Sequence, residues 1–385
     1  MSKITPELTD VIIDYLHDDR PSLCLCGLVC RSWLPSSRFH LFSTVQLYFF
    51  DVDTGLPIIC SPGSTIPSYV RHLELQNGGR SYPQWVNDAL PKLPIFSALE
   101  SLSLDHVAWG SLALEARNSL LNMSRGLKKI ALDFMQFDTI DQALEFFSSA
   151  PSLECLSLGS IVCDVEKASS TNSNNLQLKQ VTFGGDSYTI PLIDWLCSQP
   201  APSVDTLHLT LVTKKQIPSI SRYLKVLGPT LQHLGVSCAN FDSHAEFCKE
   251  IDLAHNPSLS TITFDGLVLY ADSPGTRDCL WIIEVLSRIS SPVIKMVTLV
   301  IFANTPQEIC SLHLPALTSF LSGGSGGSAV RSTSVRFAVW GEIGRMEAQT
   351  AITEGLHDLN ASGRLDFVYR DVQMASDEYR FPLIP

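Results

Sequence analysis

Few residues of this 385-residue chain have the types and spacing that catalysis requires. Ser187 is a possible nucleophile in Gly-Gly-Asp-Ser-Tyr at 184–188, but this stretch directly follows an expected strand and the sequence has no matching Asp-x-x-His. The glycines at 323–327 lack the lysine of a phosphate-binding loop and do not open a helix. These observations favour a protein that binds over a protein that catalyses.

Cysteine and histidine form no metal-binding pattern either. The closest group, Cys24, Cys26 and Cys30, has no second pair of ligands nearby at the spacing of a zinc site. The ten histidines are scattered singly, and acidic pairs such as Asp18 and Asp19 fall in an expected turn. We therefore expect no metal, no other cofactor and no catalytic residue.

The composition narrows the classes of partner. The chain has 27 basic and 39 acidic side chains, and its net charge of −12 argues against a nucleic-acid or anionic-membrane binder. No apolar segment reaches the roughly 20 residues that span a bilayer. No secretory signal precedes the first expected helix, so we expect the eleven cysteines to be reduced, in the cytoplasm, the nucleus or both.

A six-residue pattern, Leu-x-x-Leu-x-Leu or a close variant, recurs along the middle of the chain. Measured at its fourth position, successive copies are 29, 28, 26, 25, 26, 27 and 28 residues apart. A period of about 20 to 29 residues with this leucine pattern predicts one strand in each repeat. The fourth positions are Leu73, Leu102, Ile130, Leu156, Val181, Leu207, Leu234 and Ile262.

Segments with helical character separate these expected strands. They begin near residues 82, 112, 140, 190, 220, 244 and 279. One such unit cannot bury its own apolar face, whereas stacked units can. The alternation predicts an α/β fold, a curved solenoid with a parallel inner sheet and outer helices. A doubly wound single sheet would also alternate strands and helices, but without this regular strand pattern.

The repeat becomes irregular after Ile262. The next strand-like sequences place Val297, Phe337 and Phe367 at the fourth position, at intervals of 35, 40 and 30 residues. A flexible glycine and serine insertion is expected near 322–330. A last helix is expected at 346, and the residues after Asp371 are expected to fray.

The side chains between the leucines should point away from the helices, because side chains alternate across a strand. We call this the helix-free face, and we expect it to be polar, mildly acidic and able to hold a protein ligand. The alternative is a solvated sheet face without a ligand. The candidate target-binding residues are Glu74, Gln76, Ser103, Asp105, Asp133, His208, His233 and Asp265.

The first 45 residues have a different pattern. Thr5, Pro6 and Glu7 are typical of a helix start, and apolar residues then recur at helical spacing as far as Leu16. A second apolar segment, Leu23–Val29, follows a polar break. A bundle this small normally needs a metal, a disulfide or a partner for stability, and we expect a partner. Residues 38–50 are expected to form a strand and residues 51–67 a loop.

The N-terminal residues resemble an F-box. That family's pattern opens with Leu-Pro-x-Glu, continues with isoleucine and leucine at helical spacing, and closes on Val-Cys-x-x-Trp. Here the proline lies one residue later, as Pro6, and the loop after Leu16 is slightly longer. The resemblance implies that a Skp-type adaptor contacts Ile4, Pro6, Glu7, Leu8, Ile12, Leu16, Leu23, Val29, Cys30 and Trp33.

The repeats resemble leucine-rich repeats of the longer, helix-containing kind. The expected domains are an F-box at 1–45, a connecting strand and loop at 46–67, and a solenoid at 68–385. The combined resemblance implies a non-catalytic substrate-recognition subunit of an SCF-type cullin-RING ubiquitin ligase, which reaches a cullin through the adaptor and holds a target protein. The alternative is a repeat scaffold or inhibitor independent of ubiquitin, with N-terminal helices that only cap the repeats.

Overall fold

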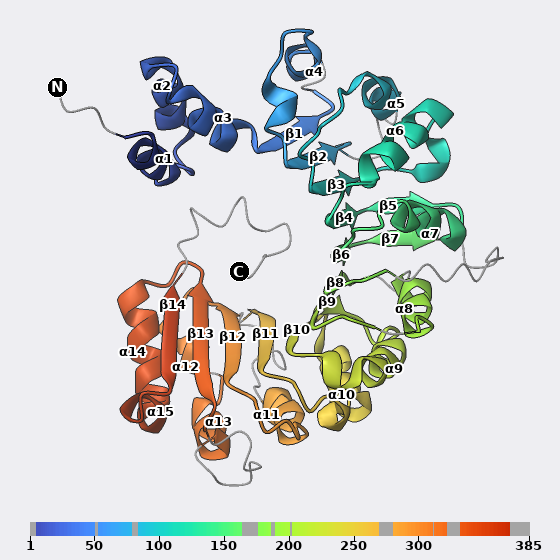
Figure 1. Cartoon of the computed structure of the whole chain (residues 1–385). Helices are drawn as coiled ribbons and strands as arrows, with labels where there is room; N and C mark the ends of the chain where they lie inside the picture. Colours follow the sequence, from blue (N-terminus) through green and yellow to red (C-terminus); the bar gives the residue numbers. More distant parts are fainter. Residues whose placement is uncertain are drawn as a thin grey trace. The chain divides into compact units, whose positions relative to one another are not determined.

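The computed structural model describes residues 5–50, 53–78, 84–163, 176–185, 189–200, 202–268, 280–310, 312–321 and 332–369. The chain divides into two compact units, residues 1–177 (unit 1) and 178–385 (unit 2). Both units are built from parallel strands with helices between them (Figure 1). The predicted α/β class, with a large parallel sheet, is confirmed.

Three short helices open unit 1, and we call them the helical head: α1 (Pro6–Asp14), α2 (Arg20–Val29) and α3 (Leu34–Phe42). A proline lies in the first turn of each helix, where its missing N–H has no intrahelical partner to lose. The predicted strand at 38–50 was wrong for residues 38–42, which belong to α3. Packing of α3 against α2 outweighs the strand preference of its aromatic residues.

The strands of unit 1 lie where the leucine pattern predicts. Each pairs in parallel with the next, and the fourth positions Leu73, Leu102, Ile130 and Leu156 stand in register. The strand predicted as a connection, β1, is instead the first strand of the sheet, paired with β2. The strands are β1 (Thr44–Tyr48), β2 (His72–Gln76), β3 (Ser101–Asp105), β4 (Lys129–Asp133) and β6 (Cys155–Leu158).

Between these strands lie helices and one small sheet, formed by β5 (Met135–Phe137) and β7 (Ile161–Cys163). The predicted loop at 51–67 contains the helix α4, whose Leu56 and Ile59 are buried. The small sheet was not predicted. The helices are α4 (Gly55–Cys60), α5 (Gln84–Ala89), α6 (Leu114–Ser124) and α7 (Ile140–Ser148), with 3-10 turns η1 (Ile66–Ser68), η2 (Leu90–Lys92) and η3 (Trp109–Ser111).

The strands of unit 2 also pair in parallel, each with the next. Beyond Ile262 the residues in register are Val297, Val335 and Leu365, so the predicted Phe337 and Phe367 were two residues too late. A shift of two residues keeps a side chain on the same face, so the apolar pattern fits both registers. The strands are β8 (Gln180–Phe183), β9 (Thr206–Val212), β10 (His233–Cys238), β11 (Thr261–Val268), β12 (Met296–Phe302), β13 (Ser334–Trp340) and β14 (Leu365–Tyr369).

The predicted helices of unit 2 are present, and α12, α13 and α15 were not predicted. The expected insertion near 322–330 and the residues after Asp371 lie outside the described residues. The helices are α8 (Ile190–Cys197), α9 (Ile217–Leu227), α10 (Phe241–Glu250), α11 (Leu280–Ser287), α12 (Pro306–Cys310), α13 (Leu314–Leu321), α14 (Arg345–Gly355) and α15 (His357–Ala361), with 3-10 turns η6 (Gly228–Thr230) and η7 (Leu253–His255).

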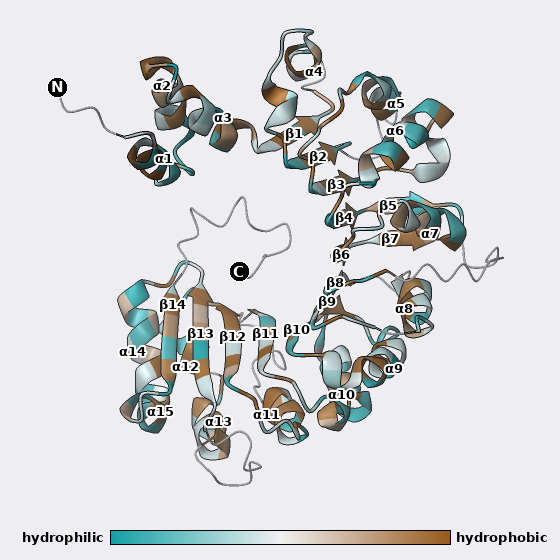
Figure 2. Ribbon diagram, viewed as in Figure 1, coloured by the Kyte–Doolittle hydropathy of each residue, from teal (hydrophilic) through white to brown (hydrophobic). Residues whose placement is uncertain are grey.

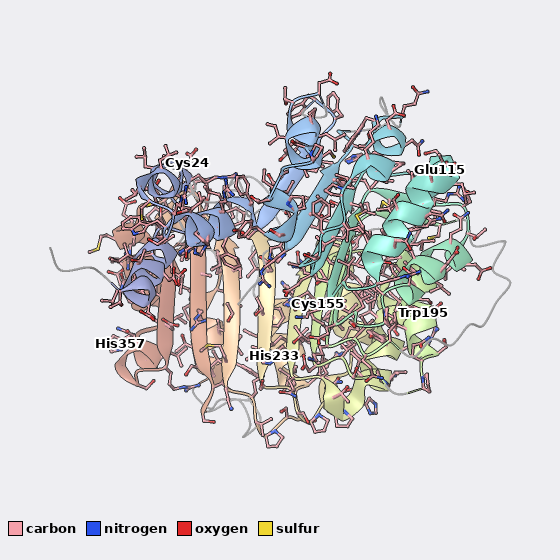
Figure 3. The ribbon with its side chains drawn as sticks, turned by 45° about the horizontal axis from the view of Figure 1, so that its top comes forward. Cys24, Glu115, Cys155, Trp195, His233 and His357 are labelled. Atoms are coloured by element: carbon pink, nitrogen blue, oxygen red, sulfur yellow. The ribbon has the colours of Figure 1, made fainter. Side chains whose placement is uncertain are left out.

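The core of each unit lies between its strands and its helices (Figure 2). On β11, Ile262 and Phe264 are fully buried on the helix side, whereas Thr261 and Thr263 are half-buried on the opposite face. Cys155 and His233 lie on strands, whereas Glu115 and Trp195 lie on helices (Figure 3). The predicted alternation is therefore confirmed, and among the described residues it leaves one face of the strands without helices.

Candidate functional site

An apolar stripe on α1 faces outward. Leu8 is 57% exposed and Tyr15 is 83% exposed, with Val11 and Ile12 exposed between them. These positions are separated by three and four residues, so they lie on one face of the helix. Ile13, on the opposite face, is fully buried. The described part of the chain therefore leaves the main apolar face of its first helix in contact with water.

The second helix repeats this arrangement. Leu25, Leu28 and Val29 are exposed, with Leu28 at 83% and Val29 at 61%, again at helical spacing. The opposite face of α2 supplies Leu23 and Cys26 to the core of the head. Since single exposed leucines are common but exposed apolar stripes are not, these faces indicate a site of protein association.

Polar contacts fix α1 against α3. His40 Nε2 lies 2.8 Å from Asp14 Oδ1, and the hydroxyl of Ser36 donates to Asp10. The carboxylates sit on the polar face of α1, so the contacts hold the helix without covering its apolar stripe. The head is therefore ordered while the stripe stays accessible.

The predicted adaptor-binding residues other than Leu23 fall into three groups. Leu8, Ile12 and Val29 are exposed, as are Glu7 and Cys30. Leu16 and Trp33 are half-buried. Ile4 lies outside the described residues, and Pro6 is placed in the first turn of α1 without a described side chain.

Leu23 requires a correction. It is fully buried, so it stabilises the head and presents no atoms to a partner in this conformation. Two further exposed leucines of α2, Leu25 and Leu28, were not predicted. Helical spacing could have identified Leu25 and Leu28, because Leu25 lies three residues before Leu28 and four residues before the predicted Val29 on α2.

Cys30 ends α2 at the edge of this apolar face. Its thiol lies 3.0 Å from the hydroxyl of Ser32. Hydrogen bonds from the Ser32 hydroxyl and the backbone amide of Trp33 lower the pKa of the Cys30 thiol. These bonds orient the segment between α2 and α3, which carries the closing part of the predicted pattern.

On the helix-free face of unit 1, three predicted acids are half-buried. Glu74 accepts a hydrogen bond from Gln46 Nε2 at 2.9 Å, and Asp105 lies 2.6 Å from His106 Nδ1. Burial raises the pKa of Asp133, and the nearby charge of Asp105 raises it further. Ser103 is a small residue between these acids, and Lys129 on β4 lies on the same face.

Gln76 does not belong to this surface. It is 5% exposed, because it stands in register between Tyr48 and Asp105, whose side chains flank it. The prediction assumed that every alternate residue is accessible. A larger side chain on a neighbouring strand can cover such a residue, as Tyr48 does here.

The helix-free face of unit 2 carries the predicted His208, His233 and Asp265, all half-buried. His233 Nδ1 lies 2.7 Å from the hydroxyl of Thr261. His208 packs over Gly235, where an added Cβ would lie 2.5 Å from its Nδ1. The absent side chain at residue 235 is what makes room for the imidazole.

We expect the stability of unit 2 to fall at acidic pH. Burial lowers the pKa of His208 below 6.5, and the neighbouring His233 lowers it further. The folded state therefore disfavours the charged imidazole. Below the unfolded pKa of about 6.5, protonation favours the unfolded state, so the free energy of unfolding decreases as the pH falls. Urea unfolding should show a lower midpoint at pH 5.0 than at pH 7.5.

His208→Gln should reduce this pH dependence. It should not abolish it, because burial also lowers the pKa of His244 on α10. An equal pH dependence in the variant and the unaltered chain would contradict this assignment.

Ser187 lies outside the described residues. Within the described ranges, no group of three or more histidine, cysteine, aspartate or glutamate side chains could hold a metal ion. None of the helices there is long and apolar enough to cross a membrane.

Comparisons with known proteins find a likeness to solved structures and no other match. No family model matches the chain, and no curated protein matches it. Among solved structures, the chain is similar to the crystal structure of the Rad7 and Elc1 complex in yeast. The identity is 14% and the TM-score 0.38, over 91% of this chain and 85% of that chain.

The fold and these surfaces define the class of the protein. It is an α/β repeat protein in which a head of three helices precedes parallel strands with intervening helices. Its head exposes two apolar helix faces, and its strands expose a polar face.

Proposed function

We propose that the chain is an F-box protein with leucine-rich repeats, the substrate-recognition subunit of an SCF-type cullin-RING ubiquitin ligase. The observation that carries the proposal is the outward apolar stripe of the head, from Leu8 to Tyr15 on α1 and from Leu25 to Val29 on α2. A Skp-type adaptor that covers these stripes would complete the small helical core. The role places the protein in the cytoplasm or the nucleus.

In this role the chain needs no catalytic residue of its own. The adaptor would connect the head to a cullin, and the helix-free face would hold a target protein. Binding raises the effective concentration of target lysines near a ubiquitin thioester carried by another enzyme. The half-buried acids Glu74, Asp105 and Asp133 favour a target segment with basic side chains.

The alternative is a repeat scaffold whose N-terminal helices only cap the first strands. That function would place the apolar stripe of α1 against the repeats. The exposure of Leu8 and Tyr15 in the described chain favours the adaptor-binding role instead.

Ile12→Asp should abolish co-purification with a Skp-type adaptor. A carboxylate at this exposed position would be buried without a partner in the complex, at a cost of about 3 kcal/mol or more, which is over a hundredfold in affinity. The folded chain alone should lose under about 0.5 kcal/mol, because the side chain is at the surface. Adaptor capture and circular dichroism measure the two effects.

Leu114→Asp is the matched control, since Leu114 is 69% exposed at the start of α6, outside the head. It adds the same charge at an exposed apolar position and should leave adaptor capture unchanged. Equal capture of Ile12→Asp and Leu114→Asp would contradict the proposed function.

A further inference from the structure

Two aromatic side chains stack at the carboxyl ends of β3 and β4, which are neighbouring strands of unit 1 (Figure 1). The ring centroids of His106 and Phe134 lie 4.4 Å apart, and the ring planes are inclined by 20°. Phe134 is nevertheless 53% exposed, although it is a large apolar residue. The stack therefore leaves aromatic surface in contact with water at this end of the strands.

Both rings are carried by strained backbone. His106 has a φ of +58° and Phe134 a φ of +46°. In this left-handed conformation the Cβ lies too close to the following carbonyl oxygen, so bulky residues rarely adopt it. Such strain is concentrated at functional sites. Backbone conformation alone would favour glycine at residue 134, so the exposed phenylalanine ring is a candidate for contact with a ligand.

Two carboxylates border the stack, and they are the last residues of the same two strands. Asp105 Oδ1 lies 2.6 Å from His106 Nδ1. Asp133 Oδ1 accepts hydrogen bonds from the backbone amides of Phe134 and Ser160, at 3.0 and 3.1 Å. Among the described residues, the second oxygen of each carboxylate, Oδ2, makes no hydrogen bond or ion pair. Each carboxylate therefore keeps one oxygen for a ligand.

The charges around the stack are arranged along the strands. Burial raises the pKa of Asp133, and the charge of Asp105 raises it further, so the two carboxylates lie close enough to repel each other. Lys129, on the same face, is the first residue of β4. At about 3.3 Å per residue it lies about 13 Å from Asp133 along the strand. The carboxyl ends of β3 and β4 are therefore acidic beside an exposed aromatic ring.

An arginine side chain fits both parts of this surface. Its planar guanidinium can stack on the face of an aromatic ring while its N–H groups donate to neighbouring carboxylates. A lysine ammonium is a compact, strongly hydrated charge and stacks less well. An apolar ligand would use the ring but would leave both carboxylates without a partner.

We propose that an arginine side chain of the target protein binds to the surface made of Asp105, His106, Asp133 and Phe134. The guanidinium stacks on the ring of Phe134 and donates hydrogen bonds to the free Oδ2 atoms of the two carboxylates. This inference deepens the proposed function, and it rests on that function for the view that the ligand belongs to a target protein.

Fluorescence anisotropy with the full chain tests the proposal. The probe is a fluorescein-labelled peptide of three Ser-Arg units. The same peptide with citrulline, which has the shape of arginine without its charge, should bind at least about tenfold more weakly. Phe134→Gly should weaken binding of the arginine peptide about fivefold or more, because the ring is lost. Asp133→Asn, which keeps the acceptor oxygen but not the charge, should weaken it about tenfold.

Leu211→Gly is the matched control for Phe134→Gly. Leu211 is 58% exposed and has a φ of +52°, but it lies on β9 in unit 2. Its substitution should leave binding of the arginine peptide unchanged. Glycine adopts a positive φ without strain, so Phe134→Gly should unfold in urea at a midpoint no lower than that of the unaltered chain. Its loss of binding would then not come from unfolding.

Equal binding of the arginine peptide by Phe134→Gly and Leu211→Gly would overturn the proposal, and so would equal binding of the arginine and citrulline peptides by the unaltered chain. Adaptor capture by the same proteins separates this proposal from the proposed function. Adaptor capture without binding of the arginine peptide would overturn the arginine site alone. Peptide binding that is sensitive to Phe134→Gly, without adaptor capture, would overturn the adaptor-binding role alone.

Discussion

Leu23→Asp is expected to unfold the helical head while the repeat strands stay folded. Leu23 is fully buried between the helices of the head. A carboxylate there would be buried without a partner, at a cost on the order of 4 kcal/mol or more. A head of three short helices has little stability to lose. Trypsin should then cleave rapidly at Arg31 and Arg38, and adaptor binding should be lost.

The comparison with Ile12→Asp separates the two faces of the head. Ile12→Asp should lose adaptor binding and keep its resistance to trypsin, because Ile12 faces water whereas Leu23 faces the core. Trypsin resistance of Leu23→Asp equal to that of the unaltered chain would contradict the assignment of Leu23 to the core.

Gly341→Ala is expected to destabilise unit 2 by about 3 kcal/mol or more. Gly341 follows β13 with a φ of +131°, a conformation that residues with a Cβ rarely adopt. An added Cβ would also overlap the carbonyl oxygen of Ala303, which is fully buried after β12. The backbone of two adjacent strands would have to separate. Urea or thermal unfolding measures the loss.

Gly363→Ala is the matched control for this prediction. Gly363 has a φ of +67°, and an added Cβ would meet no atom within 4 Å. Its substitution should cost only about 1 kcal/mol, from the backbone conformation alone. A loss of stability at Gly341 no larger than at Gly363 would show that the overlap with Ala303 is relieved without cost.

The strands could be predicted from the sequence because each carries its own local signal. The leucines at the fourth position stand in register from Leu73 to Leu156 and from Val181 to Ile262, as the spacing predicts. Elements without that signal were missed. The helix α4 contains Gly55 and Pro57 and is followed by Pro62 and Gly63, so its sequence predicts a loop. Burial of Leu56 and Ile59 stabilises it as a helix.

In the helical head, apolar periodicity did not predict which helix face is buried. The sequence of α2 predicted an apolar helix. Because apolar residues lie on nearly all faces of α2, the pattern could not show that Leu23 is buried and Leu28 exposed. That choice is made by the packing of α3. Gln76 was predicted on the correct face of its strand, but side chains of the two neighbouring strands cover it. The sequence of a single strand does not predict this cover.

Isothermal titration of the full chain with a purified Skp-type adaptor, at several temperatures, tests the central claim most directly. If the apolar stripes of α1 and α2 are completed by the adaptor, binding should be saturable at one to one, with a negative heat-capacity change from apolar burial. Ile12→Asp should remove the signal, and Leu114→Asp should retain it. Absence of binding by the unaltered chain, or equal binding by the Ile12→Asp variant, would contradict the account.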